Sequence, residues 1–458
     1  MPKPFHILPL RSELQQGIEQ AGYTEMTAIQ EESLPAMLKG LDVMGQAKTG
    51  SGKTAAFGLA LLNAIDPALL KTQALVLCPT RELAEQVASE LRRLATRMAN
   101  TRILTLCGGR PYRDQLAALK HGNHVVVGTP GRIAKHLRKQ TLRLGGLSVV
   151  VLDEADRMMD MGFLEQVTDI LEHTPPDRQT LLFSATFPEE IQALSQSLQR
   201  VPQMISVAAQ VAPALLKQSV FVCKRGQRHQ MVIDLLAKYQ PGTALVFAET
   251  RADCDDLARL LRQHNAMALS LHGMMEQRDR DDVLIQFSNG SASVLVATNV
   301  AARGIDIPAL PMVIISELSQ EPESHLHRIG RTGRAGEEGQ ALSIVESPRE
   351  LDRLERVEAL LGAPIETGPI PPKGTDLGFL KPTCRTLLIL AGRNEKIRKG
   401  DVLGGLVKDA GIPPEKIGRI DLMPKACAVA IDRAYAEMAL NHLENGRIKN
   451  RRLRARLL

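Results

Sequence analysis

The stretch DVMGQAKTGSGKTAAFGLALLNAI (residues 42–65) decides the fold of this chain. A short apolar run comes first, a Gly-rich loop follows at 45–54, and an apolar, helix-like run follows the loop. This strand–loop–helix order is the context that a phosphate-binding loop requires. Small residues let backbone N–H groups converge on phosphate oxygens, and the N-terminus of the next helix adds partial positive charge.

The polar residues of this loop have defined expected contacts. Lys53 would reach the β- and γ-phosphates of ATP, and the Thr54 hydroxyl would ligate Mg²⁺. Ala47 stands where the strict pattern has Gly, and a chance Gly-rich turn is the alternative interpretation. The loop residues expected to bind ATP are Lys48, Thr49, Gly50, Ser51, Gly52, Lys53 and Thr54.

An acidic partner for the loop is expected at the end of another sheet strand, and VVVLDEAD supplies it. Asp153 would hold the Mg²⁺ shell, and Glu154 would orient or deprotonate the attacking water. The alternative is an acidic helix N-terminus that complements the helix dipole. A phosphate-binding loop about 100 residues upstream favours the catalytic interpretation.

Short apolar runs separated by helical patterns recur along the chain, which is typical of buried parallel sheets. The runs form two series that separate near residues 205–215. We therefore expect an α/β fold with two tandem parallel-sheet domains, at 1–208 and 209–362. The first series is DVMGQ, ALVLCPT, RILTLCGG, HVVVGTP, SVVVLDEAD and TLLFSAT, and the second is TALVFAET, MALSLHG, SVLVATN, PMVIISEL and QALSIVES.

A Pro/Gly-rich break at 363–382 predicts a linker. The remainder, 383–458, has the pattern βαββαβ, which predicts a small α+β domain like an RNA-recognition motif. The basic end GRIKNRRLRARLL (446–458) would be its last strand, with Arg452, Arg454 and Arg456 on one face.

Charge is unevenly distributed along the 458 residues. The net charge is +6, but the part from Cys384 onward holds 16 Lys/Arg and 8 Asp/Glu. The preceding residues are therefore nearly neutral, and a polyanion partner is indicated for the C-terminal domain. Six scattered cysteines without a C-x-x-C pair indicate reduced thiols in a cytoplasmic protein. No signal peptide or membrane-spanning run is expected.

Together these residues resemble the DEAD-box RNA helicases, and with the βαββαβ end they are most similar to the bacterial DbpA type. The resemblance covers roughly residues 1–360, in ordered blocks. They are AKTGSGKT (47–54), PTRELA (79–84), GG (108–109), TPGR (129–132), DEAD (153–156), SAT (184–186), VFAET (246–250), LHG with QRDR (277–280), ATNVAARGID (297–306) and HRIGRTGR (327–334).

The resemblance implies further ATP contacts. Gln30 would read adenine and Phe5 would stack on it, with simple packing as the alternative for Phe5. Gly304 and Asp306 belong to the block that binds ATP, and Asp306 would bond the ribose. Departures from the family pattern are Met26 in place of Pro, Asn299 in place of Asp, and the segment ISELSQ (315–320).

The resemblance also implies that the two α/β domains are RecA-like and that catalysis involves both. Arg331 and Arg334 would act as arginine fingers, presented by one helical face because they are three residues apart. Since they belong to the second domain, the active site would be complete only when the domains close. Ser184, Thr186 and His327 would couple ATP to RNA binding.

The implied RNA contacts grip phosphates and 2′-hydroxyls and give little sequence selectivity. In the helicase domains they are Pro79, Thr80, Arg81, Gly109, Thr129, Gly131, Arg132, Arg251, Gly273, Gln277 and Thr298. The C-terminal domain has Tyr435 as its only aromatic residue, so basic groups would read the RNA. The candidates there are Lys396, Arg398, Lys399, Arg447, Lys449, Arg451 and Arg452, with a solvated basic face as the alternative.

The expected activity is therefore ATP-dependent local unwinding of RNA, with ATP and Mg²⁺ as cofactors. The resemblance implies a 23S rRNA hairpin in pre-50S particles as the partner, and no DNA or membrane. Two alternatives stay open. One is a DNA-directed ATPase of the same superfamily. The other is an RNA-binding assembly factor, ATP-dependent or ATP-independent, with little unwinding.

Overall fold

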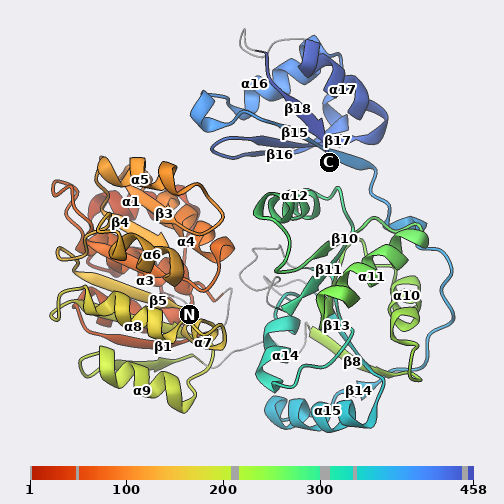
Figure 1. The fold of residues 1–458 in the computed structure, drawn as a ribbon, viewed down its shortest axis with the longest axis horizontal. Helices are drawn as coiled ribbons and strands as arrows, with labels where there is room; N and C mark the ends of the chain where they lie inside the picture. Colours follow the sequence, from red (N-terminus) through yellow and green to blue (C-terminus); the bar gives the residue numbers. More distant parts are fainter. Residues whose placement is uncertain (1–2, 48–50, 208–215, 300–309, 334–337, 446–451) are drawn as a thin grey trace. The chain divides into compact units, whose positions relative to one another are not determined.

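The computed structural model describes residues 3–47, 51–207, 216–299, 310–333, 338–445 and 452–458. The described residues divide into two units, one within 3–207 and the other within 216–458. The first unit holds one β-sheet and the second holds two (Figure 1). In the described part of the chain, no helix combines the length and apolar character needed to span a membrane.

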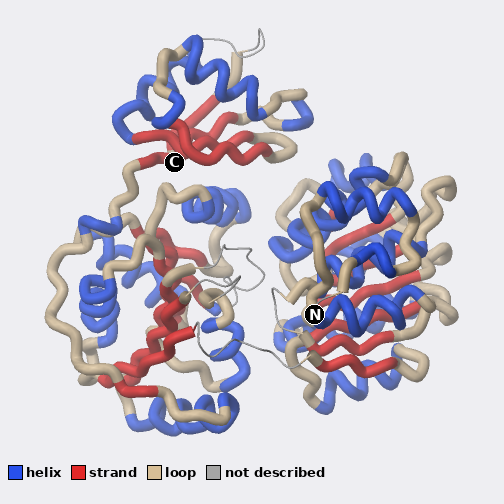
Figure 2. Tube along the Cα trace, turned by 180° about the vertical axis from the view of Figure 1, so that it is seen from behind, coloured by secondary structure: helices blue, strands red, loops and turns tan. Residues whose placement is uncertain are grey.

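The sheet of the first unit has seven strands in the order β3-β4-β2-β5-β6-β1-β7, and every pair is parallel. Its central strands are rich in Val and Leu and fully buried, as expected where helices cover both faces (Figure 2). The strands are β1 (Val43–Gln46), β2 (Ala74–Leu77), β3 (Ile103–Leu106), β4 (Val125–Gly128), β5 (Val149–Asp153), β6 (Gln179–Ser184) and β7 (Gln203–Ser206).

Alternate residues of a strand point into separate cores on the two faces of this sheet. On β2, Ala74 and Val76 belong to one core, and Leu75 and Leu77 belong to the other. The first core includes α1 (Ser12–Gln20), α2 (Ala28–Leu38), α3 (Lys53–Ala64) and α4 (Arg81–Leu94). The second core includes α6 (Pro130–Arg138), α7 (Ala155–Asp160), α8 (Leu164–Glu172) and α9 (Glu189–Leu198), while α5 (Tyr112–Lys120) lies between β3 and β4 in sequence.

The larger sheet of the second unit repeats this design. Its order is β10-β11-β9-β12-β13-β8-β14, again with parallel pairs throughout. The strands are β8 (Leu216–Val222), β9 (Ala244–Ala248), β10 (Ala268–Leu271), β11 (Val294–Thr298), β12 (Met312–Ile315), β13 (Gly339–Val345) and β14 (Glu366–Thr367). The helices are α10 (Arg228–Tyr239), α11 (Arg251–Gln263), α12 (Gln277–Ser288), α14 (Pro322–Ile329) and α15 (Pro348–Leu361).

The Pro/Gly-rich segment 363–382 is attached to this second sheet along much of its length. It contributes β14, and the N–H of Gly374 donates to the Asp234 carboxylate at 2.6 Å. Leu377 and Leu380 are fully buried in the core that α10 and α11 cover. Figure 1 shows the segment passing beside these helices. The segment therefore connects the second and third sheets as a packed strip.

The third sheet is antiparallel and has the order β16-β17-β15-β18. Strands and helices follow one another as βαββαβ, as the sequence predicts. The elements are β15 (Cys384–Ile389), α16 (Lys399–Gly404), β16 (Ile417–Leu422), β17 (Cys427–Asp432), α17 (Arg433–Asn445) and β18 (Ala455–Leu457).

The expectation for the basic end is only partly right. β18 pairs with β15 over three residues, so of the alternating arginines only Arg456 lies in the strand. Arg452 and Arg454 precede the strand and are exposed. The prediction that all three arginines share one strand face is therefore wrong, because the pairing with β15 is too short to include them.

Polar contacts join this third sheet to α12 and the residue that follows it. The Asn289 amide donates to the Thr386 hydroxyl at 2.9 Å, and both side chains are buried. The Arg456 guanidinium contacts the Asp282 carboxylate at 2.6 Å. Since both carboxylate oxygens of Asp282 accept from Arg456 Nη2, the last strand is tied directly to α12.

The face of the sheet that makes these contacts is the one opposite its own core. Leu387 and Ile389 of β15 point into that core, so the alternate residues Thr386 and Leu388 point the other way. Thr386 is 0% exposed and Leu388 is 4% exposed. This buried face has no aromatic side chain of the kind on which an ordinary RNA-recognition motif stacks bases.

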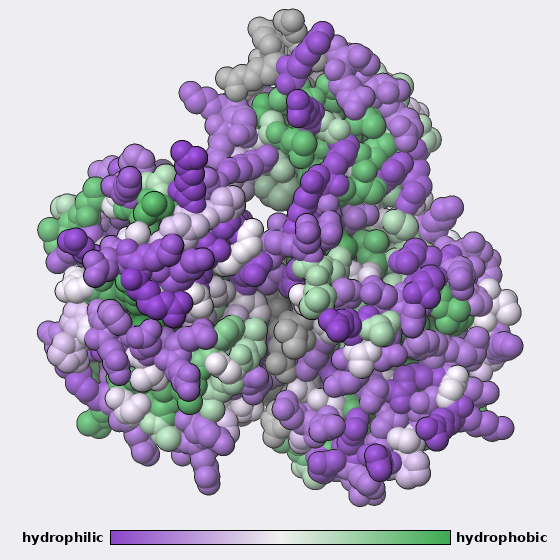
Figure 3. Space-filling view, viewed as in Figure 1, coloured by the Kyte–Doolittle hydropathy of each residue, from purple (hydrophilic) through white to green (hydrophobic). Residues whose placement is uncertain are grey.

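The sequence prediction of the fold class is confirmed. All eleven apolar runs named above form strands, in the two parallel sheets expected. Three strands, β7, β8 and β14, were not predicted. β7 is mostly exposed and β14 has only 2 residues, so both lack the continuous apolar pattern of the central strands. Hydrophilic residues cover most of the visible surface, as Figure 3 shows.

We predict an acid-sensitive contribution to stability from His325 on α14. Its side chain is 2% exposed, and neither ring nitrogen has a hydrogen-bond partner in the described part of the chain. Burial, and then the nearby charge of Arg328, lowers the pKa of His325 to about 4. Since an unfolded histidine titrates near 6.5, stability is retained above that pH and lost as pH falls toward 4.

The variant His325→Phe should remove this effect. At pH 5 it should keep about 2 kcal/mol of unfolding free energy that the parent loses relative to pH 7. Urea unfolding at the two pH values measures the difference. The exposed His121→Phe substitution controls for loss of a histidine as such. Equal acid destabilisation of parent and His325→Phe would contradict the prediction.

Candidate nucleotide and RNA sites

The phosphate-binding loop lies between β1 and α3, as the sequence predicts. Lys48, Thr49 and Gly50 lie outside the described residues, and the described part begins at Ser51. Gly52 has φ +92°, and a Cβ there would come within 2.6 Å of the Gln30 amide nitrogen. Helix α3 starts immediately after Gly52, at Lys53, so the N-terminus of the helix is adjacent to the loop backbone.

Gln30 connects the loop to the preceding helix α2. Its amide oxygen accepts from the Thr27 N–H at 2.8 Å, and its amide nitrogen donates to the Gly52 carbonyl at 3.0 Å. Gln30 is 1% exposed. The oxygen of this amide is therefore fixed by the start of α2, and its nitrogen is fixed by the loop. Adenine recognition is predicted for this same side chain.

Phe5 occupies a different environment from the one the resemblance implies. Its ring is 4% exposed and packs against Tyr23, with centroids 6.1 Å apart. Met26, the departure from the family's Pro, is also buried in this core, and its N–H donates to the Lys3 carbonyl. The position of Phe5 supports core packing, and stacking on adenine stays a prediction.

A buried ion pair links the loop to the DEAD segment. Lys53 Nζ lies 3.0 Å from Asp153 Oδ1 and 3.9 Å from Glu154 Oε1, and all three side chains are buried. Burial alone would lower the pKa of Lys53, but Asp153 and Glu154 outweigh it and raise this pKa. Burial raises the pKa of Asp153 while Lys53 opposes the rise. Lys53 therefore stays protonated at neutral pH.

The residues present fit a magnesium ion bound largely through phosphate and water. Asp153 is 0% exposed, and among the described residues neither carboxylate oxygen accepts a hydrogen bond, so Asp153 is held there by its ion pair with Lys53. No group of three or more His, Cys, Asp or Glu able to hold a metal occurs there either. Mg²⁺ suits such a site, since it keeps several waters and uses one or two carboxylates.

Glu154 is held in an unusual backbone conformation beside this pair. Its φ is 56°, in the left-handed region, and its side chain contacts Arg157 at 2.8 Å. Arg157 is 2% exposed. Arg157 was not among the predicted site residues, although its position directly after DEAD was an available signal. A buried arginine at this distance orients the carboxylate of Glu154.

Asp156 joins the DEAD and SAT segments directly. One carboxylate oxygen accepts from the N–H groups of Ala185 and Thr186 and from the Thr186 hydroxyl, at 3.1 to 3.3 Å. The N–H of Asp156 donates to Ser184 Oγ at 3.2 Å. The two predicted coupling residues Ser184 and Thr186 are therefore bonded to the acidic segment.

In the second unit the structure corrects one expectation. Helix α14 contains His327 and ends at Ile329, with Gly330 as its C-cap, so Arg331 lies beyond the helix. The prediction that one helical face presents Arg331 and Arg334 is therefore wrong. Arg331 is 3% exposed, and its carbonyl accepts from Leu310 N–H. Arg334, Gly304 and Asp306 lie outside the described residues.

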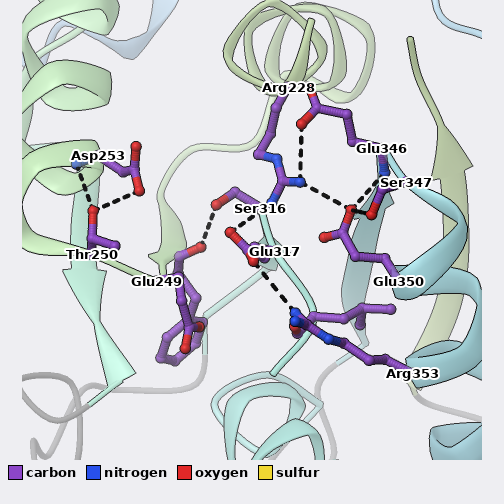
Figure 4. A network of polar contacts seen from close by, with 12 residues as sticks. Arg228, Glu249, Thr250, Asp253, Ser316, Glu317, Glu346, Ser347, Glu350 and Arg353 are labelled. Atoms are coloured by element: carbon purple, nitrogen blue, oxygen red, sulfur yellow. Dashed lines mark hydrogen bonds and ion pairs between the residues drawn. The ribbon is translucent and has the colours of Figure 1, made fainter. Parts of the chain in front are cut away.

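A network of polar contacts holds the segment before α14 (Figure 4). Glu317 contacts Arg228 at 3.0 Å and Arg353 at 3.4 Å, and its carbonyl accepts from Arg328 at 2.7 Å. Arg328 is 1% exposed and also contacts Glu249 at 3.0 Å. The departure ISELSQ thus has a structural role, because Glu317 ties α10, α14 and α15 together.

The same network includes the end of β13. Arg228 contacts Glu346 at 3.2 Å and Glu350 at 3.0 Å. Ser316 donates its hydroxyl to the Phe247 carbonyl at 2.7 Å. The other departure, Asn299, donates its amide to the Ser324 hydroxyl at 3.4 Å on α14. The network was missed because its members are far apart in sequence and look like ordinary surface charges.

The predicted RNA contacts of the first unit lie where strands end and helices begin. Thr80 caps α4 and accepts from the Leu83 N–H at 3.2 Å, and Arg81 is the first residue of that helix. The Arg81 guanidinium lies against Gly108, next to the exposed Gly109. Pro79 precedes Thr80 and is buried, while Thr129 caps α6, followed by exposed Gly131 and half-buried Arg132. They gather at the carboxyl ends of β2, β3 and β4.

The corresponding residues of the second unit follow the same rule. Arg251 is the first residue of α11 after β9, and Thr298 ends β11. Gly273 follows β10 and is exposed, and Gln277 begins α12. The two groups belong to different units, so their combination into one RNA track stays a prediction.

The C-terminal candidates are only partly described. Lys396, Arg398 and Lys399 are exposed, and they surround the start of α16. Arg452 is exposed as well. Arg447, Lys449 and Arg451 lie outside the described residues. None of the described candidates lies on the buried sheet face that contacts α12.

Comparison with known proteins identifies the family. Residues 27–194 match the DEAD/DEAH box helicase family, 227–336 the helicase conserved C-terminal domain, and 386–457 the DbpA RNA binding domain. The structure of S. cerevisiae Dbp5 bound to RNA and ADP BeF3 is similar, with a TM-score of 0.74 and 29% identity over 80% of this chain and 96% of that one.

Two curated relatives carry the comparison further. DEAD-box ATP-dependent RNA helicase CshA of Geobacillus kaustophilus (strain HTA426) is 42% identical, over 77% of this chain and 76% of its own. ATP-dependent RNA helicase DbpA of Escherichia coli (strain K12) is 47% identical, over 96% of each chain. This chain therefore belongs to the DEAD-box ATP-dependent RNA helicases, and within them to the DbpA type with its C-terminal RNA-binding domain.

Proposed function

We propose that this helicase unwinds short RNA duplexes locally in the cytoplasm, and that its C-terminal domain directs it to a 23S rRNA hairpin during large-subunit assembly. The observation that supports the enzymatic part is the buried constellation of Lys53, Asp153 and Glu154 next to the loop held by Gln30. A chain that served only as an RNA-binding assembly factor would not need buried charges aligned with a phosphate-binding loop.

The first unit supplies most of the chemistry that hydrolysis requires. Lys53, protonated at neutral pH, would neutralise charge on the β- and γ-phosphates. Thr54 and Asp153 would hold Mg²⁺, which supplies electrostatic stabilisation of the transferring phosphoryl group. Glu154, oriented by Arg157, would position the attacking water and accept its proton.

Further contacts complete the proposed ATP site. Gln30 would exchange one of its present hydrogen bonds for the adenine edge, because both ends of its amide are already occupied. Ser51 Oγ is buried without a hydrogen-bond partner among the described residues, which suits a phosphate oxygen. In the second helicase domain, Gly304 and Asp306 would bind the nucleotide, and Arg331 and Arg334 would stabilise the transition-state charge.

RNA contacts would be of two kinds, those that hold any RNA and those that select the target RNA. The residues at the strand ends of the helicase domains would hold phosphates and 2′-hydroxyls. Asp156, bonded to Ser184 and Thr186, would transmit the state of the nucleotide to them, with His327 acting in the second domain. The exposed basic residues near α16 would select the target RNA, because the sheet face that lacks the core is already in contact with α12.

Replacing Glu154 by Gln should abolish ATP turnover and preserve ATP binding. The amide keeps the shape of the side chain but cannot accept a proton, so turnover should fall by about 10² or more. Steady-state phosphate release and equilibrium binding of a fluorescent ATP analogue measure the two effects separately. Retained turnover would contradict the assignment of Glu154.

Replacing Lys53 by Ala should abolish turnover and also weaken ATP binding. This change leaves Asp153 buried without its cation, while Glu154 keeps Arg157, so it should also destabilise the fold, by about 3 kcal/mol. Thermal unfolding therefore has to accompany the assay. Turnover above a trace in the folded variant would exclude Lys53 from the site.

RNA stimulation tests the proposed target. ATPase activity is measured without RNA, with unrelated RNA, with DNA and with a large-subunit rRNA fragment. We expect strong stimulation by the rRNA fragment, and truncation after Pro382 should spare the basal activity and remove this preference. Equal stimulation by any RNA would keep the helicase and discard the target, and equal stimulation by DNA would favour a DNA-directed ATPase.

A point variant complements the truncation, which also exposes Asn289 and Asp282. Lys399→Glu at the start of α16 should reduce stimulation by the rRNA fragment by about tenfold and leave stimulation by unrelated RNA unchanged. The matched control is Lys408→Glu, an exposed lysine of the same domain that is not among the candidates. Equal effects of the two substitutions would remove Lys399 from the RNA-binding surface.

A further inference from the structure

The first unit carries a concentration of positive charge that the count over the whole helicase region conceals. Between Gly108 and Arg143 there are eight Lys/Arg and a single acidic residue, Asp114. This segment contains α5, which follows the GG motif, and α6, which begins within the TPGR motif. Its net charge of +7 is comparable to that of the C-terminal domain, so a second polyanion-binding surface needs to be considered.

The cations of α6 form a stripe that continues from the TPGR motif. Arg132, Lys135 and Lys139 are spaced three and four residues apart, so they lie along one side of the helix and its C-cap. All three reach the ring of Tyr112 on α5. The distances to the ring centroid are 6.0 Å from Arg132 Cζ, 5.6 Å from Lys135 Nζ and 5.1 Å from Lys139 Nζ.

The Tyr112 ring, which lies near all three cations, is fixed by stacking and by a hydrogen bond. Tyr112 stacks on His136, with centroids 4.5 Å apart and an interplanar angle of 14°, and His136 is 0% exposed. Thr141 Oγ1 lies 3.1 Å from the Tyr112 hydroxyl and 2.8 Å from His136 Nδ1. Gln115 Oε1 lies 3.1 Å from both His136 Nε2 and Arg132 Nη1. The Tyr112 ring beside the cations is therefore held in place by His136 and Thr141, and Arg132 is held by Gln115.

His136 itself contributes no charge to this surface at neutral pH. Burial, and then the positive charges of Arg132 and Lys135, lowers the pKa of His136 to about 4. Its neutral ring supports Tyr112, while the charges stay at the surface on Lys135 and Lys139, which are exposed. The neutral, buried His136 ring therefore stacks on the Tyr112 ring, and the cations lie around Tyr112 at the surface.

These exposed cations lack acidic partners. In the described part of the chain, Lys135, Arg138 and Lys139 form no ion pair with Asp or Glu. An ordinary solvated face would intersperse the two signs, because like charges on one helix face repel each other. Nearby Arg110 differs, since it contacts Glu85 at 3.0 Å. The unbalanced stripe is consistent with an external anion.

We propose that Lys135 and Lys139, positioned by the Tyr112 ring, bind backbone phosphates of RNA just beyond the segment that the GG and TPGR motifs contact. The proposal rests on the proposed function, because it assigns an additional part of the same RNA substrate to this surface. RNA fits better than an acidic protein segment, since the stripe starts at Arg132, which the family pattern already assigns to RNA. A chain of evenly spaced phosphates would continue along such a stripe.

The test compares a short and a long RNA on the full chain. Oligouridylates of about six and about twenty nucleotides, bound in the presence of a non-hydrolysable ATP analogue, report the helicase grip alone and the grip with its extension. The variant is Lys135→Glu with Lys139→Glu. Fluorescence anisotropy at several salt concentrations gives the affinity and its salt dependence.

We expect the double variant to bind the long RNA on the order of tenfold more weakly and the short RNA as tightly as the parent. The slope of log affinity against log salt for the long RNA should fall by about 1.4, for two lost phosphate contacts. The matched control is Lys39→Glu with Lys71→Glu, the same charge change at the amino ends of β1 and β2, opposite the motifs. It should leave both affinities unchanged.

Several outcomes would overturn the proposal. They are unchanged binding of the long RNA by the double variant, an equal loss in the control, and an equal loss for the short RNA. Poly-glutamate that competes for the surface as well as RNA of equal charge would assign it to acidic protein partners. Failure of the parent to bind any RNA would contradict the proposed function, a result that is distinct because it appears before any variant is compared.

Substitutions of Tyr112 separate a role in binding from general charge. Tyr112→Phe keeps the ring and should retain the parent's affinity for the long RNA. Tyr112→Ala removes the support on which the cations converge and should weaken the long RNA alone, by about threefold to tenfold. Equal binding by the Phe and Ala variants would exclude the ring from the proposed surface.

Discussion

Parallel strand pairing is the constraint on which the rest of the molecule depends. Every neighbouring pair in both large sheets is parallel, so all carboxyl ends of a sheet's strands meet at one edge. The central strands are buried on both faces, and polar groups are therefore confined to the loops at the edges. The phosphate-binding loop, DEAD and SAT all follow strands of one sheet, which brings them together although over 130 residues separate the first from the last.

Within that edge, a few buried polar contacts determine the geometry. Gln30 contacts Gly52, Lys53 contacts Asp153, and Asp156 contacts Thr186. Each pair connects one motif to the next, so a change at Gln30 can reach the SAT segment through direct protein contacts without passing through solvent. Buried charges are costly to leave unpaired, and this chain of contacts therefore resists substitution more than surface ion pairs do.

The positive charge of the chain is placed by tertiary structure into separate surfaces. One lies around α16 in the C-terminal domain, and the other lies on α5 and α6 of the first unit. The sheet face on which many RNA-recognition motifs stack bases is instead directed toward α12 through Asn289–Thr386 and Asp282–Arg456. That arrangement agrees with the lack of stacking aromatics, because a face used for intramolecular contact has no need of them.

The sequence by itself determined the fold class, the positions of the central strands along the chain and the motifs that follow them. Continuous Val/Leu runs and Gly-rich turns are local signals, and they require no knowledge of distant residues. Strands such as β7 and β14 were missed because edge strands are short and half-exposed, so their pattern is weak. The extent of β18 was overestimated, since alternation of Arg and Leu indicates a possible strand but pairing with β15 sets its length.

Only the tertiary structure decided which charged residues have partners. Arg157, Glu317 and Arg228 looked like surface charges, yet they are buried or joined in ion pairs between separate elements. Conversely, the stripe on α6 was hidden within a nearly neutral total, because a sum along the sequence averages over faces that the fold separates. Periodicity reports what is local, whereas contacts between distant segments depend on the packing of the sheets and helices.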